Sequence, residues 1–211
     1  MQSAVSNLKL QGLSLLPSSI KLIDIQDRIL DISNYTNFSI SPIEVLKSAI
    51  HDYLNEYDYV LIDCPPNLGY ITQNGIEISD YYLIPTVPDR LSTYGIPQII
   101  KKINELSTWR HLKIKCLGLI ITKYVLNSSV HTLMIKDLPA RMKMIGQSLN
   151  LDSPRIFKTV MPQANATAEA MDYDKKFSTF SEKHGYSRSA DMPLHHYVTN
   201  LTQEFLRYAG N

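Results

Sequence analysis

Residues 57–69 read Tyr-Asp-Tyr-Val-Leu-Ile-Asp-Cys-Pro-Pro-Asn-Leu-Gly, and this stretch decides the fold. Tyr59–Ile62 is a short apolar run without alternation, the pattern of a strand that is buried on both faces of a parallel sheet. The run ends at Asp63 before a Pro-Pro turn. Ligands of open α/β sheets bind beyond the carboxyl ends of the strands, where a carboxylate can hold Mg²⁺ through water. On spacing alone, an Asp that caps the next helix is the better explanation.

Upstream of this stretch, the pattern predicts one strand and two helices. Leu13–Leu16 is an apolar run that stops at a proline turn, so it is interpreted as a buried strand. Ile20–Leu30 has the apolar spacing of an amphipathic helix. Ser41 and Glu44 have the spacing of a capping box, which predicts a helix from Ser41 to about Asn55.

Downstream, helices and strands continue to alternate. The predicted helices cover residues 70–78, 91–106, 129–149 and 193–208, and the predicted strands cover residues 81–85, 114–122 and 155–160. Alternation of this kind indicates an α/β fold, a doubly wound, mostly parallel sheet with helices on both faces. We expect one domain over residues 1–211, with the polar stretch 172–192 as a surface loop.

The stretch 57–69 closely resembles the Walker B and switch II segment of ParA/Soj-type partition ATPases, which belong to the deviant Walker A (MinD/ParA) superfamily. Three further segments resemble later parts of the family pattern in the right order: residues 72–86, residues 117–122, and residues 156–162 followed by Glu169-Ala170. The resemblance covers about residues 8–208. It implies a P-loop NTPase-like fold.

The resemblance also implies roles for particular residues. Asp63 would be the catalytic acidic residue, linked to Mg²⁺ through a water molecule. The switch II loop would consist of Pro65, Pro66, Asn67, Leu68 and Gly69. The nucleotide base would be lined by Met161, Pro162 and Gln163. Cys64 belongs to the same pattern, and a lone thiol after a buried strand is expected to pack rather than to react.

The phosphate-binding loop of the family is absent from these residues. A P-loop needs clustered glycines around the phosphates and a lysine beside them. The chain has eight glycines, no two of them within five residues of each other, and none of them precedes a lysine. The family's opening strand–helix–strand unit would therefore be missing. A fragment and a relic that lost ATP binding are the two explanations, and we favour the fragment because the other motifs are undamaged.

Charge is distributed unevenly although the net charge is only +1. Residues 1–100 carry 5 Lys/Arg and 11 Asp/Glu, whereas residues 101–211 carry 16 and 9. This asymmetry suggests a polyanion-binding face in the second half, and dispersed basic residues on solvated helices explain it equally well. The candidate DNA-binding residues are Lys175, Lys176, Lys183 and Arg188. A solvated polar loop is at least as good an account of those four.

Taken with the resemblance, these features lead to three functional hypotheses. The first is a partition ATPase with ATP and Mg²⁺ as cofactors, homodimerisation, nonspecific DNA binding and a ParB-like or cargo-adaptor partner, of which this chain alone would not bind ATP. The second is a non-catalytic remnant that binds protein or DNA. A membrane-positioning relative is the third, and the segment 200–211 argues against it because a basic amphipathic anchor is missing there. Two cysteines without metal-ligand spacing and the lack of a long apolar stretch fit a cytoplasmic location. Association with the nucleoid is what the resemblance implies.

Overall fold

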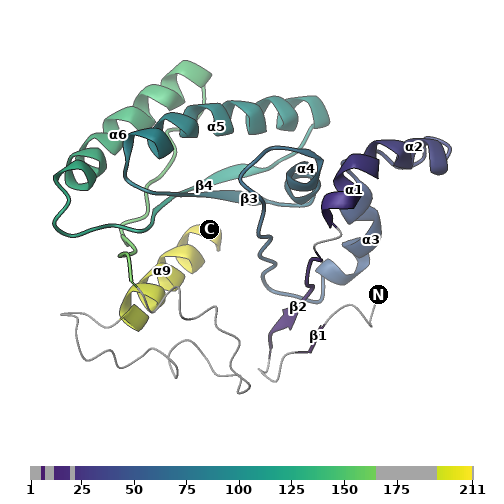
Figure 1. Ribbon diagram of the computed structural model, residues 1–211, viewed down its shortest axis with the longest axis horizontal. Helices are drawn as coiled ribbons and strands as arrows, with labels where there is room; N and C mark the ends of the chain where they lie inside the picture. The colour runs from purple at the N-terminus through teal and green to yellow at the C-terminus, as the bar shows by residue number, and fades with distance from the viewer. Residues whose placement is uncertain (1–5, 8–11, 20–21, 165–193, 211) are drawn as a thin grey trace. The chain divides into compact units, whose positions relative to one another are not determined.

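The computed structural model describes residues 6–7, 12–19, 22–164 and 194–210 (Figure 1). The chain divides into two compact units, Met1–Ser79 and Asp80–Asn211. Each unit is described separately below. None of the helices that the structure describes combines the length and the apolar run needed to cross a membrane.

The first unit is mostly helical in its described part. Its elements are β1 (Ser6–Asn7), β2 (Ser14–Leu15), α1 (Leu22–Arg28), the 3-10 helix η1 (Ile29–Asp31), α2 (Ile32–Tyr35), α3 (Val45–Leu54) and α4 (Tyr70–Glu77). The helix expected at 20–30 is confirmed as α1 and η1. The strand expected at Leu13–Leu16 shortens to β2, which pairs antiparallel with β1. It was wrongly expected to be buried, because Leu13, Leu15 and Leu16 are 46–50% exposed.

The helix expected to begin at Ser41 begins later, at Val45. Half of the capping box forms, since the backbone N–H of Ser41 donates to the Glu44 carboxylate at 3.3 Å. The Ser41 side chain does not cap α3, and Glu44 itself occupies the N-cap position. α3 begins later than predicted because residues 42–44 form a turn instead of the first helical turn.

The second unit contains the parallel sheet. Its elements are β3 (Tyr81–Thr86), α5 (Arg90–Arg110), β4 (Lys115–Ile121), α6 (Ser129–Leu149) and α9 (Leu194–Ala209). β3 and β4 pair in parallel, with a register irregularity between Tyr82 and Leu83. The strand expected at 155–160 is reduced to isolated parallel bridges that join Leu119 to Ile156 and Tyr124 to Pro162. The α/β class with parallel pairing is confirmed.

Side-chain caps define where the two long helices of this unit begin. The Asp89 carboxylate accepts a hydrogen bond from the Ser92 backbone N–H at 2.7 Å, and the Ser128 hydroxyl oxygen accepts one from the His131 N–H at 3.2 Å. Such contacts satisfy N–H groups that have no partner inside a helix. α6 therefore spans the predicted residues, and α5 is longer than predicted and continues through Pro97.

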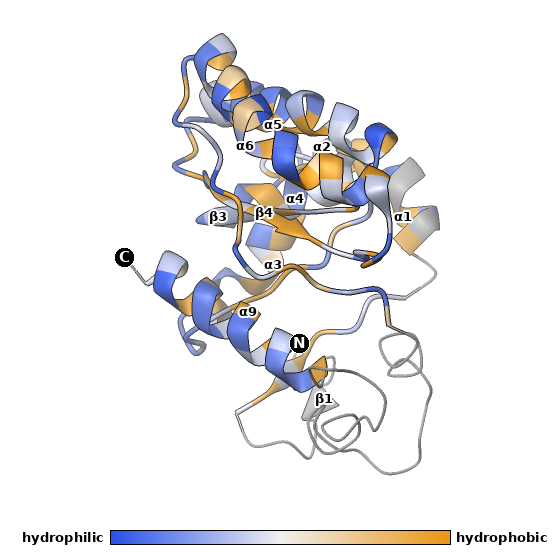
Figure 2. Cartoon of the chain, turned by 90° about the vertical axis from the view of Figure 1, so that its left-hand side faces the viewer, coloured by the Kyte–Doolittle hydropathy of each residue, from blue (hydrophilic) through white to orange (hydrophobic). Residues whose placement is uncertain are grey.

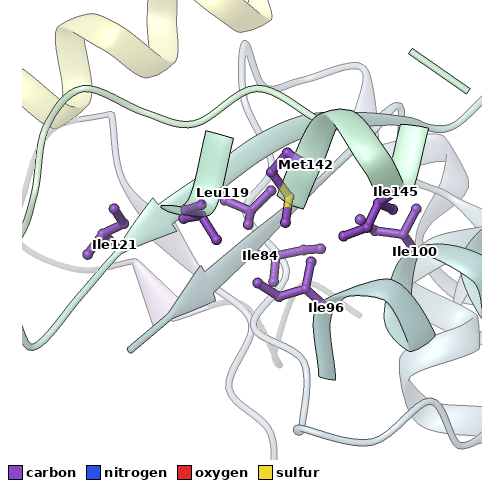
Figure 3. Packing of buried hydrophobic residues seen from close by; sticks show 8 residues of the cluster. Ile84, Ile96, Ile100, Leu119, Ile121, Met142 and Ile145 are labelled. Atoms are coloured by element: carbon purple, nitrogen blue, oxygen red, sulfur yellow. The ribbon is translucent and has the colours of Figure 1, made fainter. Parts of the chain in front are cut away.

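The hydrophobic core of the second unit lies between the sheet and the helices α5 and α6 (Figure 3). Its members are Ile84, Ile96, Ile100, Leu119, Ile121, Leu138, Met142 and Ile145. β3 contributes Ile84, β4 contributes the alternate residues Leu119 and Ile121, and each helix contributes residues three or four apart. These are the two periodicities that bring side chains to one face. Hydrophilic and hydrophobic residues are interspersed along both helices (Figure 2).

Candidate functional site

The segment around Asp63 does not form the strand that its sequence predicts. Residues 57–65 connect α3 to α4 without regular structure, as the plain coil between these helices shows (Figure 1). Tyr59, Val60 and Leu61 are 50%, 45% and 79% exposed. The expectation of a buried strand is therefore wrong for this chain. The physical reason is that a strand exists only in a ladder, and no described segment pairs with this one.

One side of this segment nevertheless packs against α4. A Cβ atom at Gly75 would lie 3.1 Å from Cys64 Sγ and 3.2 Å from Ile62 Cγ2. A glycine at this position of α4 therefore allows the segment to approach the helix closely. Partial burial raises the pKa of the Cys64 thiol, and the negative charge of Asp63 raises it further. The raised pKa disfavours the reactive thiolate, although the Cys64 side chain is exposed and not fully packed.

The loop expected to be switch II is held to the first turns of α4. The Thr72 hydroxyl donates to the Asn67 carbonyl at 2.5 Å, and the Gln73 side-chain amide donates to the Leu68 carbonyl at 2.9 Å. Within the loop, the Gly69 N–H donates to Asn67 Oδ1 at 3.0 Å. The loop that follows Asp63 thus has a defined shape.

Asn74 connects this helix to α3, and the sequence analysis did not single it out. Its side-chain nitrogen donates to the Pro42 carbonyl at 2.8 Å, while its side-chain oxygen accepts from the Leu46 N–H at 2.9 Å. Asn74 is buried, as is Thr72. The available signal was a run of polar residues, Thr72-Gln73-Asn74, at the start of a predicted helix. Consecutive polar residues at the start of a helix indicate side chains that form hydrogen bonds with backbone groups of neighbouring segments.

Asp63 itself is exposed. Within the described ranges, no group of three or more His, Cys, Asp or Glu side chains could hold a metal ion. A single carboxylate fits the role expected of Asp63, because Mg²⁺ keeps most of its waters and takes its remaining ligands from phosphates.

The segment expected to line the nucleotide base is fixed to the end of β4. Met161 donates its N–H to the Ile121 carbonyl at 2.9 Å, and the Met161 carbonyl accepts from the Tyr124 N–H at 3.1 Å. The Gln163 N–H donates to the Tyr124 carbonyl at 2.9 Å. Met161 and Pro162 are half-buried, and Gln163 is exposed. This backbone pairing gives the segment a defined course.

Glu204 of α9 anchors the preceding residues, and sequence reasoning missed it. Its carboxylate accepts from the Lys158 N–H at 2.7 Å, from the N–H and hydroxyl of Thr159 at 3.0 Å each, and from the Tyr208 hydroxyl at 2.8 Å. Burial raises the pKa of Glu204, but these hydrogen bonds together hold it below its ordinary value. A buried carboxylate with four donors ties α9 to the segment 158–159.

A cavity of about 540 Å³ lies beside this anchor. Its lining residues are Lys158, Thr159, Val160, Tyr197, Asn200, Gln203, Glu204 and Arg207. None of the predicted site residues lines it. The cavity therefore does not coincide with the expected nucleotide site.

The predicted site residues fall into three groups. Asp63 and the loop 65–69 lie together in the first unit, and Met161–Gln163 lie in the second. Lys175, Lys176, Lys183 and Arg188 lie outside the described residues, as does the expected surface loop 172–192.

Residues 1–116 match a protein-family model described as an AAA domain. Soj of Bacillus subtilis, described as a sporulation initiation inhibitor protein, is 24% identical over 149 residues, which are 71% of this chain and 54% of Soj. The chain spans about a third to a half of the length of the first relatives that it matches.

Solved structures show the same fold. The apo McdA structure from Cyanothece has a TM-score of 0.68 at 21% identity and matches 95% of this chain and 72% of McdA. Cobyrinic acid a,c-diamide synthase from Mycobacterium smegmatis, bound to an ATP analogue and magnesium, has a TM-score of 0.62 at 22% identity, over 78% of this chain and 60% of the enzyme. The chain belongs to the AAA-domain family that residues 1–116 match, and it is a ParA/Soj-type, partition-ATPase-like protein with a P-loop NTPase fold.

Proposed function

We propose that this chain is the nucleotide-responsive body of a partition ATPase, and that it requires a phosphate-binding loop that its 211 residues do not contain. The observation that carries the proposal is the loop 65–69, which follows Asp63 directly and is fixed to α4 through Thr72 and Gln73. A short element that is anchored at one end can change its course when a γ-phosphate arrives, as switch segments of nucleotide-binding proteins do. In this proposal Asp63 holds Mg²⁺ through water, and Met161, Pro162 and Gln163 contact the base.

The intact protein would use ATP and Mg²⁺. The support is chemical: exposed Asp63 offers one carboxylate, which leaves the remaining Mg²⁺ positions to phosphate oxygens and water. Bound Mg²⁺ would neutralise charge that develops on the phosphates. Hydrolysis would be coupled to homodimerisation and to a ParB-like or cargo-adaptor partner in the cytoplasm.

A direct test joins the missing unit to this chain. A strand–phosphate-loop–helix–strand unit of the family pattern is fused in front of the 211 residues, and Mg-ATP binding is measured by calorimetry. We expect saturable, Mg²⁺-dependent binding that Asp63→Ala weakens at least tenfold, whereas Asp152→Ala, an exposed acidic residue of the second unit, leaves it unchanged. A folded fusion without nucleotide binding would favour the non-catalytic remnant.

Nonspecific DNA binding is the second part of the proposal, and charge supports it. Residues 101–164 carry 11 Lys/Arg and 3 Asp/Glu. Lys101 and Lys102 on α5 and Lys136 and Lys143 on α6 are exposed, so their charges are available to phosphates. Lys175, Lys176, Lys183 and Arg188 would add to them. Several such contacts are needed for useful affinity, which makes the binding strongly dependent on salt.

A further inference from the structure

The imidazole of His131 holds the loop that connects β4 to α6. Its Nδ1 atom accepts a hydrogen bond from the Val125 backbone N–H at 3.1 Å. The His131 backbone N–H donates in turn to the hydroxyl of Ser128, the N-cap of α6, at 3.2 Å. His131 is therefore fixed to the start of α6 through its backbone and to the loop through its side chain. A ring nitrogen that accepts carries no proton, so a neutral imidazole with its proton on Nε2 fits this contact.

Tyr124, the residue before this contact, is bound to the segment that is expected to line the nucleotide base. Its N–H donates to the Met161 carbonyl at 3.1 Å, and its carbonyl accepts from the Gln163 N–H at 2.9 Å. The pair Tyr124 and Pro162 forms an isolated parallel bridge. The position of Tyr124 therefore helps to set the course of residues 161–163.

The loop needs support because one of its first residues has a costly backbone conformation. Lys123 has a φ of 53°, in the left-handed region that residues other than glycine rarely adopt. Such a conformation persists where surrounding contacts offset its cost. The hydrogen bond from Val125 to His131 is one such contact, and the rings of Tyr124 and His131 lie 6.2 Å apart between centroids. Without these contacts the chain after Lys123 is free to relax, which moves Tyr124 away from residues 161–163.

A capping role for α6 does not account for the His131 side chain. A cap satisfies backbone N–H groups inside the first turn of a helix, and Ser128 does this here. The donor to His131 Nδ1 is Val125, which lies before the helix. The side chain therefore stabilises the loop.

We propose that His131 is a positioning residue for the nucleotide base. Through Val125 and Tyr124 it holds residues 161–163 in the course in which they contact the base, and it does not touch the base itself. This inference rests on the proposed function, in which Met161, Pro162 and Gln163 line the base.

Amide hydrogen exchange of the full 211-residue chain, followed by NMR, tests the positioning directly. In His131→Leu, exchange at the Val125 and Gln163 amides should become about fivefold faster, the ratio that corresponds to one lost hydrogen bond. His131→Asn should restore slow exchange, because the Asn Oδ1 can take the place of Nδ1 as acceptor. His131→Gln, a polar replacement whose oxygen lies farther out, should behave like His131→Leu. The control is His51→Leu, at an exposed position of α3, which should leave exchange at these amides unchanged.

Nucleotide binding tests whether this positioning matters for the base. In the fusion described above, His131→Leu should weaken Mg-ATP binding about fivefold, and His131→Asn should restore it. Mg-tripolyphosphate, which has no base, should bind equally to the unmodified fusion and to both variants. A general disturbance of the fold would weaken the binding of both ligands.

Unchanged exchange at Gln163 in His131→Leu and His131→Gln would overturn the proposal, and so would failure of His131→Asn to restore slow exchange. Equal losses of Mg-ATP and Mg-tripolyphosphate binding would overturn the role toward the base. A fusion that binds neither ligand without any change at His131 would contradict the proposed function instead, and the exchange measurement would still decide whether His131 holds residues 161–163.

Discussion

At the residue scale, burial distinguishes two leucines that have similar surroundings in the sequence. Leu61 and Leu119 both lie in apolar runs typical of central strands. Leu119 is fully buried within the core of the second unit, and Leu61 is 79% exposed. The difference comes from neighbouring segments. Leu119 pairs with β3 on one side and forms an isolated bridge to Ile156 on the other, whereas Leu61 pairs with no described segment.

Truncation of these two leucines should therefore have very different effects. Leu119→Ala should lower the free energy of unfolding by about 3 kcal/mol, because it removes buried methyl groups and leaves a cavity. Leu61→Ala should change it by less than about 0.5 kcal/mol, as is usual for exposed positions. Urea denaturation of both variants measures the difference. Equal losses would mean that Leu61 is buried in solution.

The Glu204 anchor predicts a pH-dependent stability. The folded pKa of Glu204 lies below its ordinary value of 4.5 because hydrogen bonds to the ionised form outweigh burial. The anchor thus contributes its full stability above pH 4.5 and loses it as pH falls through the lower, folded pKa. Glu204→Gln should cost about 2 kcal/mol at pH 7, the usual worth of hydrogen bonds to a charged group.

Urea denaturation between pH 7 and pH 3 measures this effect. The unmodified chain should lose stability more steeply below pH 4.5 than the Glu204→Gln variant does. Glu105→Gln is the matched control, because the Glu105 side chain is 60% exposed and pairs only loosely with Lys101 at 3.9 Å. Parallel pH curves for the unmodified chain and Glu204→Gln would contradict the anchor.

At the scale of elements, helices were easier to predict than strands. α6 has the predicted bounds because Ser128 caps it locally and Asn150, with a positive φ, ends it. Residues 59–62 and 155–160 did not form full strands, since a strand depends on partners that lie far away in the sequence. The role of Glu204 could not be found either, because its backbone donors, Lys158 and Thr159, lie 46 and 45 residues away along the chain.

The hydrogen bonds of Asn74 let us predict how much the contact between α3 and α4 contributes to the free energy of unfolding. Asn74→Ala removes the acceptor for the Leu46 N–H and the donor to the Pro42 carbonyl. Because these groups are part-buried, leaving them without a partner should cost about 2 kcal/mol. The free energy of unfolding from urea titration checks this value. Asn127→Ala, at an exposed turn position, should change it by less than about 0.5 kcal/mol. A similar small effect at Asn74 would show that the two helices are joined by other contacts.

At the scale of the whole molecule, the charge asymmetry predicts DNA binding by the second half of the chain. In a gel-shift titration with random-sequence duplex DNA, the chain should bind at low salt and weaken steeply as salt rises. Replacing Lys101, Lys102, Lys136 and Lys143 together by Gln should reduce the salt dependence, because fewer counterions are released. Replacing Lys9, Lys21 and Lys47 instead should have little effect. Absence of a shift at low salt would remove the polyanion-binding proposal.

The second unit has a buried hydrophobic core, whereas the Asp63 segment of the first unit has exposed apolar residues and pairs with no strand that the structure describes. The fold class was predictable, since alternating helices and strands and the ordered motifs extend along most of the sequence. The state of the Asp63 segment was not predictable from its own residues. A strand needs partner strands far away in the sequence, and among the described residues none pairs with this segment.

The central claim is that Asp63 can hold the Mg²⁺ of Mg-ATP through water, but that these 211 residues do not contain the loop that would bind the phosphates. Calorimetric titration of Mg-ATP into the 211-residue chain tests it most directly. We predict no saturable heat of binding at ATP concentrations up to the millimolar range. Micromolar, Mg²⁺-dependent binding that Asp63→Ala abolishes would contradict the account, because the chain would then hold the phosphates without a P-loop.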